Sequence, residues 1–169
     1  MIRLANINDV NQIMEIVNDA INFLKENHVN QWQNGYPNRE IILNDIKSNS
    51  LYVYENTEVL GFAYISSEEE PSYKIIDGAW LTLGNYMVVH RIAVKKEHTN
   101  KGIAKKLMEE AITIARSKGI KSIRVDTHRD NLVMNNFLKS LGFVKCGEIL
   151  LIDYIDSDKL RTAYELIIN

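Results

Sequence analysis

Apolar residues recur at helical spacing near the start of the chain. Asn8 or Asp9 can cap a first helix, because each has a short side chain that accepts hydrogen bonds from free backbone N–H groups. The apolar face of this helix is formed by Val10, Ile13, Met14, Val17, Ile21 and Leu24. Asn38 can cap a second, shorter helix whose apolar residues are Ile41, Ile42 and Ile46. The pattern therefore predicts two helices in the first third of the chain.

Two further helices are predicted in the second half of the chain. One runs from about Gly102 to Ser117, and Gly119 supplies its stop. Its apolar face consists of Ile103, Leu107, Ala111, Ile114 and Ala115. The other begins after Asp130 or Asn131 as the capping residue and ends at Gly142. All four helices have an apolar face suited to packing against a sheet.

Runs rich in β-branched and aromatic residues separate these helices and predict strands. The clearest is Met87 to Val94 (MVVHRIAV). Leu51 to Glu55 and Val59 to Ser66 lie on either side of Asn56-Thr57, which predicts an antiparallel hairpin. The remaining strands are predicted near residues 121–127, 143–151 and 162–168.

The order of these elements predicts the fold class. A hairpin combined with one strand–helix–strand crossover is typical of an α+β or mixed α/β protein with helices packed against one sheet. A length of 169 residues suits one domain, since domains cluster near ~100–150 residues. The sequence contains no internal repeat and no linker rich in Pro, Gly and Ser. We therefore expect a single domain that spans residues 1–169.

Charge and cysteine content exclude several classes of function. The formal net charge is −2, so no global field attracts nucleic acid or an anionic membrane. The single cysteine, Cys146, cannot form an internal disulfide or a thiolate metal cluster, which suggests a reducing compartment. The start of the chain lacks a signal-peptide pattern, and no apolar stretch approaches the ~20 residues that cross a bilayer. We expect a cytoplasmic protein that binds neither nucleic acid nor a membrane.

Two polar segments allow alternative interpretations. Residues 30–37 (NQWQNGYP) have the Gly and Pro of a loop, yet they include Trp32 and Tyr36, which either line a substrate pocket or close over the core. Residues 68–71 (EEEP) form a polar break. This break either attracts a cationic substrate or is a solvated turn, and the solvated turn is the simpler interpretation.

The segment from Lys95 to Ala104 (KKEHTNKGIA) has the chemistry of a pyrophosphate cradle. A helix start offers unpaired backbone N–H groups and a partial positive charge. Gly102 lets the backbone approach a bulky anion, and Ala104 keeps the next position small. The local basic residues are Lys95, Lys96, Lys101, Lys105 and Lys106. Neither a P-loop nor a dinucleotide-binding G-x-G-x-x-G motif is present.

An ordered set of motifs surrounds this segment. The strand ends in the apolar triplet Ile92-Ala93-Val94, and a loop leads to the turn Gly102-Ile103-Ala104. A helix and a strand follow, and then Asn131 to Phe143 (NLVMNNFLKSLGF). This arrangement resembles the GNAT acetyltransferase family, whose members have a [QR]-x-x-G-x-[GA] turn and a later N-x-x-A-x-x-x-Y-x-x-x-G-F-like helix. The resemblance covers about residues 86–143 without gaps, and the flanking element order also fits.

The resemblance implies a fold and an activity. Family members have one domain with a central mixed, mostly antiparallel sheet that splays after its fourth strand. The implied activity is direct transfer of an acetyl group from acetyl-CoA to a primary amine of a small molecule or peptide, in a ternary complex and without a metal. Many members dimerise, and the sequence leaves a homodimer open. A non-catalytic acyl-CoA-binding sensor on the same fold is the alternative.

The resemblance also implies which residues bind the cofactor. The backbone of Ile92, Ala93 and Val94 would pair with the pantetheine arm of CoA. The turn formed by Thr99, Asn100, Lys101, Gly102, Ile103, Ala104 and Lys105 would hold the pyrophosphate through its N–H groups. Asn131 would lie near the pantetheine arm or the leaving thiol.

The chain departs from the family pattern at two positions. Thr99 replaces the usual Gln or Arg at the head of the turn, so one side-chain contact to phosphate is lost or is supplied by a neighbouring lysine. Leu138 replaces the tyrosine that protonates the departing thiolate in many members. Leucine has no proton to give. Tyr36, Tyr154 and Tyr164 are candidate substitute acids that the sequence does not rank.

Three polar residues are candidates for proton transfer. His90 lies two residues before Ile92, where some family members use a histidine to relay a proton from the amine, and a histidine pKa near ~6.5 suits this task. Packing under the sheet is the alternative for His90. Asp126 and His128 share one face of the next strand, and they either relay a proton or cap the following helix. A metal site built from these residues is not expected.

Overall fold

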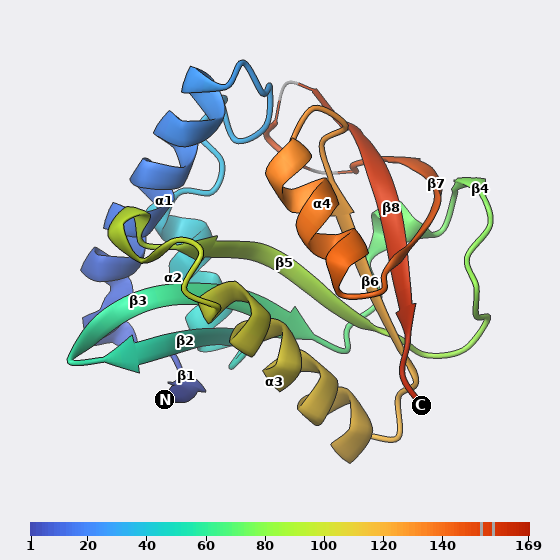
Figure 1. Ribbon diagram of the computed structural model, residues 1–169, viewed down its shortest axis with the longest axis horizontal. Coiled ribbons are helices and arrows are strands. Elements are labelled where there is room, and N and C mark those ends of the chain that lie inside the picture. Colours follow the sequence, from blue (N-terminus) through green and yellow to red (C-terminus); the bar gives the residue numbers. More distant parts are fainter. Residues whose placement is uncertain (153, 157) are drawn as a thin grey trace.

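The computed structural model describes residues 1–152, 154–156 and 158–169. In this part of the chain, eight strands form one sheet in the order β1-β2-β3-β5-β6-β8-β7-β4 (Figure 1). Their bounds are β1 (Ile2–Leu4), β2 (Leu51–Asn56), β3 (Glu58–Ser66), β4 (Asp77–Gly78), β5 (Met87–Val94), β6 (Ser122–Thr127), β7 (Val144–Leu150) and β8 (Leu160–Ile167). Neighbouring strands are antiparallel except β5 and β6, which are parallel. The expected mixed, mostly antiparallel sheet is confirmed.

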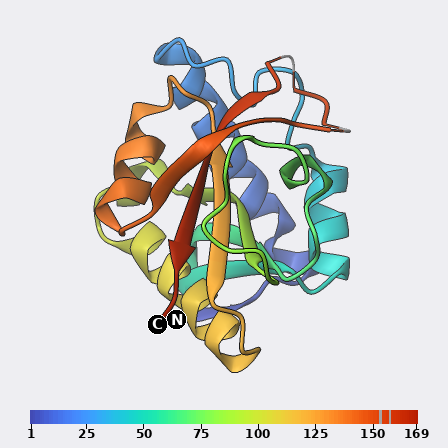
Figure 2. The same ribbon diagram turned by 90° about the vertical axis from the view of Figure 1, so that its right-hand side faces the viewer.

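Helices cover both faces of this sheet. They are α1 (Val10–Glu26), α2 (Arg39–Lys47), α3 (Ile103–Ser117) and α4 (Leu132–Ser140), with short 3-10 turns η1 (Ile7–Asp9), η2 (Pro71–Tyr73) and η3 (Lys96–His98). Figure 2 shows α3 and α4 on one side of the sheet and α2 on the other. The apolar face of α1 packs with α2 and strands β2 and β3 in one core cluster, while α3 and α4 belong to a second cluster. In the part of the chain that the structure describes, no helix is long and apolar enough to cross a membrane.

The predicted elements match the structure closely, and the differences concern short elements and one cap. Asn38 caps α2 by accepting from the backbone N–H of Ile41 at 3.0 Å. The helix start expected after Asn8 or Asp9 is built differently, since Asn6 and Asp9 form a capping box around η1 and no side chain caps α1 itself. Strands β1 and β4 were not predicted, because three and two residues are too short to show alternation.

The sheet opens between β5 and β6. These two strands pair only at Met87 with Ile123 and at Val88 with Arg124, and they separate beyond that point. The other edge of β5 pairs with β3 and contains a bulge, because one residue of β3, Ala63, lies opposite two residues of β5, Arg91 and Ile92. Arg91 has a φ of 50°. The separation of β5 from β6 leaves one edge of β5 unpaired. The bulge on its other edge changes the direction of the side chains there, as bulges commonly do near active sites.

Buried ion pairing accompanies this irregular backbone. The Arg91 guanidinium donates to both carboxylate oxygens of Asp45, at 2.8 and 2.9 Å, and to the hydroxyl oxygen of Tyr36 at 2.6 Å. Its planar group also lies 4.5 Å from the ring centroid of Tyr64. Bidentate pairing and stacking fix an arginine more firmly than a single contact does. The bulge therefore has a rigid support on the α2 side of the sheet.

Candidate active site

A cavity of ≈1180 Å³ adjoins the opened edge of β5. Its lining includes residues of α1, β5, the loop before α3, the end of β6 and the first turns of α4. The residues predicted for cofactor, substrate or proton transfer that line it are Trp32, Tyr36, His90, Ile92, Ala93, Val94, Thr99, Asn100, Gly102, Ile103, Ala104, Lys105, Asp126 and Asn131. Two predicted residues, Lys101 and His128, are not part of this lining. The structure thus brings the residues predicted to bind the cofactor and those predicted for substrate binding or proton transfer to one cavity.

The start of α3 presents free backbone donors to the cavity. Gly102 is the N-cap residue with a φ of 79°, and no side chain caps this helix. The N–H groups of Ile103, Ala104 and Lys105 in the first turn have no intrahelical acceptor. A Cβ added to Gly102 would meet no protein atom within 4 Å. This first turn therefore combines unpaired donors with open space, which is the arrangement that a phosphate group fits.

The lysines near this turn differ in whether their ammonium groups already contact other side chains. Lys95 is paired with Glu58 at 2.5 Å, and the Lys106 ammonium lies 5.3 Å from the ring centroid of Tyr54. Lys96 and Lys105 line the cavity. Lys101 is exposed and directly precedes Gly102, which also lines the cavity. Lys96, Lys101 and Lys105 are therefore the better placed cations for an anion at the start of α3.

The triplet at the end of β5 has one paired and one open edge. Ala93 pairs with Phe62 and Val94 pairs with Gly61 of β3. On the other side, β6 has already separated from β5 after Val88. An extended ligand can add to such an edge through main-chain hydrogen bonds. The triplet Ile92-Ala93-Val94 has the geometry expected for a pantetheine-binding edge.

Asn131 lines the cavity at the start of α4 and is held in place by two contacts. Its Oδ1 accepts from the backbone N–H of Met134 at 3.2 Å, and its Nδ2 donates to Gln31 Oε1 at 3.0 Å. Asn131, and not Asp130, is therefore the capping residue of α4. The same side chain connects α4 to the loop between α1 and α2.

His90 lies between two carboxylates. Its Nε2 is 3.2 Å from Glu70 Oε2, and its Nδ1 is 3.8 Å from Asp126 Oδ2. Its ring stacks against Tyr64 with centroids 5.9 Å apart. Tyr73 donates its hydroxyl to Asp126 Oδ2 at 2.7 Å. His90 and Asp126, which were predicted separately, thus belong to one polar cluster that lines the cavity.

His128 lies apart from this cluster. Its Nδ1 accepts from the backbone N–H of Asp130 at 3.1 Å, and its Nε2 is 2.7 Å from Asp158 Oδ2. The hydrogen bond with His128 lowers the pKa of Asp158. The main-chain oxygen of His128 accepts from the backbone N–H of Asn131. These contacts organise the turn that leads into α4, and the capping residue of that helix is Asn131.

The aromatic residues of the loop between α1 and α2 pack in the interior and also border the cavity. Trp32 and Tyr36 are buried in a cluster with Leu24 and Val29, and they also line the cavity. Burial raises the pKa of Tyr36 to about 12, against the opposing effect of the Arg91 guanidinium. Tyr36 therefore remains a neutral phenol.

Sequence reasoning did not connect Glu70 with the site, and it named Tyr154 only as one of three unranked substitute acids, with no link to Glu70. Glu70 is 9% exposed, although the run EEEP was interpreted most simply as a solvated turn. Tyr154 lines the cavity and donates its hydroxyl to Glu70 Oε2 at 3.1 Å. Pro71 at the start of η2 was the only local signal that this turn has a defined shape. Across residues 1–152, 154–156 and 158–169, no three His, Cys, Asp or Glu side chains are grouped as a metal site requires.

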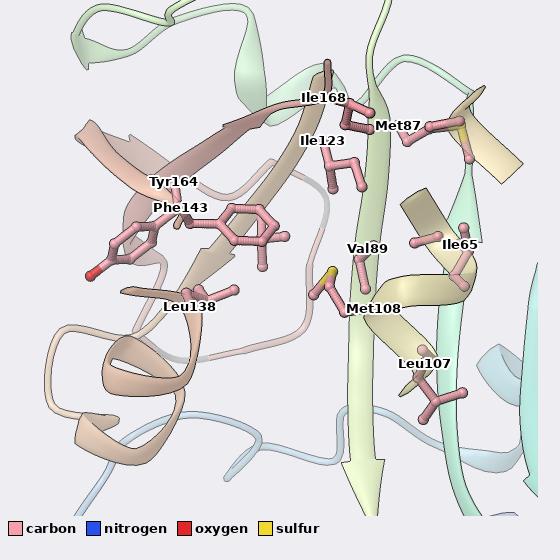
Figure 3. Packing of buried hydrophobic residues seen from close by; sticks show 14 of the residues in the cluster. Ile65, Met87, Val89, Leu107, Met108, Ile123, Leu138, Phe143, Tyr164 and Ile168 are labelled. Atoms are coloured by element: carbon pink, nitrogen blue, oxygen red, sulfur yellow. The ribbon is translucent and has the colours of Figure 1, made fainter. Parts of the chain in front are cut away.

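Leu138 does not line the cavity. It is fully buried in the core cluster with Phe143 and Tyr164, and Figure 3 shows these three side chains close together. Tyr164 donates its hydroxyl to Asn135 Oδ1 at 2.6 Å and is also directed into the interior. The position that carries tyrosine in many family members thus serves packing in this chain.

Replacing Leu138 by alanine should lower the free energy of unfolding by ~2–5 kcal/mol, because it leaves a cavity in a well-packed core. The dissociation constant for CoA should stay unchanged in the folded variant. Chemical denaturation and calorimetric titration measure the two quantities. A folded L138A variant with normal stability and weakened CoA binding would contradict this assignment.

Comparison with known proteins agrees with this geometry. The model of the acetyltransferase (GNAT) family matches residues 17–143. The chain belongs to the GNAT acetyltransferase family and is an acyl-CoA-dependent N-acetyltransferase with acetyl-CoA as its co-substrate.

Individual relatives show the extent of the similarity. A GNAT acetyltransferase structure from Streptococcus agalactiae 2603 is 30% identical and covers 100% of this chain and 95% of its own, with a TM-score of 0.88. The spermidine N(1)-acetyltransferase of Thermoplasma acidophilum is 27% identical over 154 residues, which are 84% of this chain and 86% of that protein. The PaiA N-acetyltransferase of Thermoplasma acidophilum, solved with coenzyme A, shares the fold at 23% identity and a TM-score of 0.71, over 99% of this chain and 98% of its own.

Proposed function

We propose that this enzyme transfers the acetyl group of acetyl-CoA directly to a primary amine in a ternary complex. The observation that carries the proposal is that one cavity is lined by both the uncapped start of α3 and His90. Its volume of ≈1180 Å³ exceeds that of most drug-sized ligand pockets, which are ~300–1,000 Å³. Cofactor and acceptor can therefore occupy the cavity together, as direct transfer requires.

The cofactor-binding part of the proposal uses backbone groups of this chain. The N–H groups at the start of α3 would hold the pyrophosphate, and the open edge of Ile92-Ala93-Val94 would hold the pantetheine arm. Lys96, Lys101 and Lys105 would add positive charge around the phosphates. Bound acetyl-CoA supplies a thioester as the activated acetyl donor.

CoA affinity should fall as salt concentration rises, because exposed charges are screened beyond ~8–10 Å at physiological ionic strength. Calorimetric titration of CoA at low and moderate salt measures this dependence. Titration of the phosphate-free pantetheine fragment under the same conditions provides the control and should show little salt effect. A dissociation constant for CoA that does not change with salt would contradict the contribution of the lysines.

Proton removal from the acceptor is assigned to His90. An alkyl amine with a pKa near ~10.4 is mostly protonated at neutral pH, so its attack on a thioester requires loss of a proton. His90 is the cavity-lining base that has a carboxylate on each side of its ring. Asp126 would bind the ammonium form of the acceptor, and His90 would then accept its proton.

Charge and shape favour a small cationic amine as the acceptor. Asp19, Glu26 and Asp126 line the cavity, while the cavity-lining Arg91 is paired with Asp45. The cavity-lining Arg161 is paired with Asp156 at 2.7 Å, and its Nε lies 4.0 Å from Asp126 Oδ1. The spermidine acetylation named for the Thermoplasma acidophilum relative involves an acceptor of this kind. Polyamines are therefore the first acceptors to test.

The rim of the cavity supports the same choice. The backbone N–H of Trp32 donates to Asp156 Oδ2 at 2.9 Å, and Asn34 Nδ2 donates to the oxygen of Ile155 at 2.6 Å. These bonds join the loop between α1 and α2 to the segment after β7. These two linked segments leave less room for a peptide that runs across the cavity than for a small molecule that enters it. We therefore expect polyamines to be better acceptors than peptides.

The experiment is an initial-rate study with acetyl-CoA, a polyamine and a short peptide of equal amine content. Direct transfer predicts intersecting double-reciprocal plots, and a ternary-complex pattern with the polyamine supports the proposal. Parallel plots would indicate a covalent acetyl-enzyme and would contradict direct transfer. Faster acetylation of the peptide would contradict the preferred acceptor class while leaving the reaction type intact.

A further inference from the structure

Glu70 is a buried carboxylate held by three neighbours. Its Oε1 accepts from the backbone N–H of Ser72 at 3.0 Å, as the N-cap of η2. Its Oε2 accepts from the Tyr154 hydroxyl at 3.1 Å and lies 3.2 Å from Nε2 of His90. These partners come from three different segments of the chain. Together they fix the orientation of the carboxylate next to the imidazole.

The contact between Glu70 and Nε2 bears on which ring nitrogen of His90 carries the proton. Burial alone would raise the pKa of Glu70, but the hydrogen bond and charge of His90, with help from Ser72, lower it to about 2. An ionised carboxylate can only accept hydrogen bonds. Nε2 must therefore be the donor, and in the neutral imidazole Nδ1 then has the free lone pair.

The lone pair of Nδ1 lies on the Asp126 side of the ring. The distance of 3.8 Å between Nδ1 and Asp126 Oδ2 is too long for a direct hydrogen bond. His90 and Asp126 line the cavity, whereas Glu70 is not part of the lining. A substrate nitrogen in the cavity can thus contact Nδ1 and the Asp126 carboxylate together.

We propose that Glu70 is the positioning residue that holds the proton of His90 on Nε2 and leaves Nδ1 to accept the proton of the substrate amine. An N–H bond of the bound ammonium group breaks, an Nδ1–H bond forms, and the electron pair stays on the nitrogen of the now neutral amine for its attack on the acetyl group. The resulting imidazolium remains hydrogen-bonded to the negative Glu70. This inference rests on the proposed function, because it requires His90 to be the base.

The variant E70Q tests the inference with little change in shape. The amide oxygen of glutamine still accepts from the backbone N–H of Ser72, but the amide nitrogen donates to Nε2 of His90. The ring proton then moves to Nδ1, which can no longer accept a proton from the amine. We expect kcat to fall at least tenfold, while the dissociation constant for CoA and the unfolding temperature stay close to those of the unmodified enzyme.

A matched control comes from the adjacent residue. Glu69 is exposed and forms a surface ion pair with Lys74 at 3.4 Å. The variant E69Q removes the same charge from the same turn, and its kcat should equal that of the unmodified enzyme. A folded E70Q variant with the kcat of E69Q would overturn the inference.

Nitrogen-15 NMR provides a second test that does not depend on the folding of any variant. In enzyme labelled at histidine, at a pH where His90 is neutral, long-range proton–nitrogen correlations should show a protonated Nε2 and an unprotonated Nδ1. In E70Q the two assignments should exchange. A neutral His90 protonated at Nδ1 in the unmodified enzyme would overturn the inference.

The variant H90A separates the failure of this inference from the failure of the proposed function. If H90A loses activity while E70Q keeps it, the role of Glu70 alone is wrong. If both variants keep full activity, the assignment of His90 as the base is wrong as well. If the unmodified enzyme acetylates no amine, the proposed function fails, whatever tautomer the NMR spectrum shows.

Discussion

Replacing His90 by alanine should lower kcat/KM at neutral pH by about a hundredfold, because general-base assistance contributes typically ~10²–10⁴-fold. The imidazole lines the cavity between Glu70 and Asp126, and alanine has no group that accepts the proton of the amine. Activity should recover partly at high pH, since the amine then loses its proton to water. Rates measured across the pH range with saturating acetyl-CoA test this prediction.

The control for H90A is a histidine outside the cavity lining. His28 is exposed at the end of α1 and has a φ of 57°, which asparagine tolerates well. The variant H28N should therefore keep the full rate. A folded H90A variant with near-normal rates at every pH would contradict the base assignment and direct attention to Asp126 or to an ordered water.

The second large effect is expected at the start of α3. Replacing Gly102 by valine should weaken CoA binding more than tenfold, or by ~1.4 kcal/mol. The space beside the Gly102 Cα is open in the protein, so a branched side chain there would occupy the volume assigned to the pyrophosphate. Calorimetric titration of CoA against the folded variant measures the loss.

Gly119 provides a matched control for this substitution. It follows the same helix, has a φ of 68° and also has no protein atom within 4 Å of an added Cβ, but it does not line the cavity. The variant G119V therefore carries a similar backbone strain without obstructing the cradle. Equal CoA affinities in G102V and G119V would remove the start of α3 from the binding site.

Much of the fold could be predicted because its helices and longer strands are strongly periodic. The span of β5 was predicted at its observed bounds, Met87–Val94, since its β-branched residues are dense and flanked by polar loops. Asp9, one of the two residues predicted to cap α1, is its N-cap residue, but its side chain forms a capping box with Asn6 around η1 and does not cap α1. Asn6, Asn8 and Asp9 all have side chains suited to capping. Only the chain path selects Asn6, whose Oδ1 accepts from the backbone N–H of Asn8 while Asp9 accepts from that of Asn6.

The residues of the candidate site were predicted as a group where they belong to one local motif, and the contacts that folding makes between distant residues were not predicted. Gly102 and the apolar triplet of β5 belong to one local motif and were found. Glu70 and Tyr154 are separated by 84 positions and meet only in the folded chain. In a run of three glutamates, nothing local distinguishes Glu70, which is buried, from Glu69, which is exposed.

The absence of the family's tyrosine at position 138 does not by itself distinguish an acetyltransferase from a sensor that only binds acyl-CoA. Leu138 is fully buried, so this position contributes no group to the cavity in either case. Tyr154 and Tyr36 are the tyrosines near the polar cluster that line the cavity. Burial raises the pKa of the Tyr154 phenol far above its usual value, so it stays protonated at neutral pH.

The most direct test of the central claim is a screen of acetyl-CoA against a panel of amines that includes polyamines, amino acids and short peptides, with released CoA thiol as the readout. We predict thiol release that depends on the amine, equals the amount of acetylated product and is greatest with a polyamine. Mass spectrometry of the product confirms the stoichiometry. Tight binding of acetyl-CoA without thiol release for any amine would contradict the assignment of catalysis and indicate an acyl-CoA sensor.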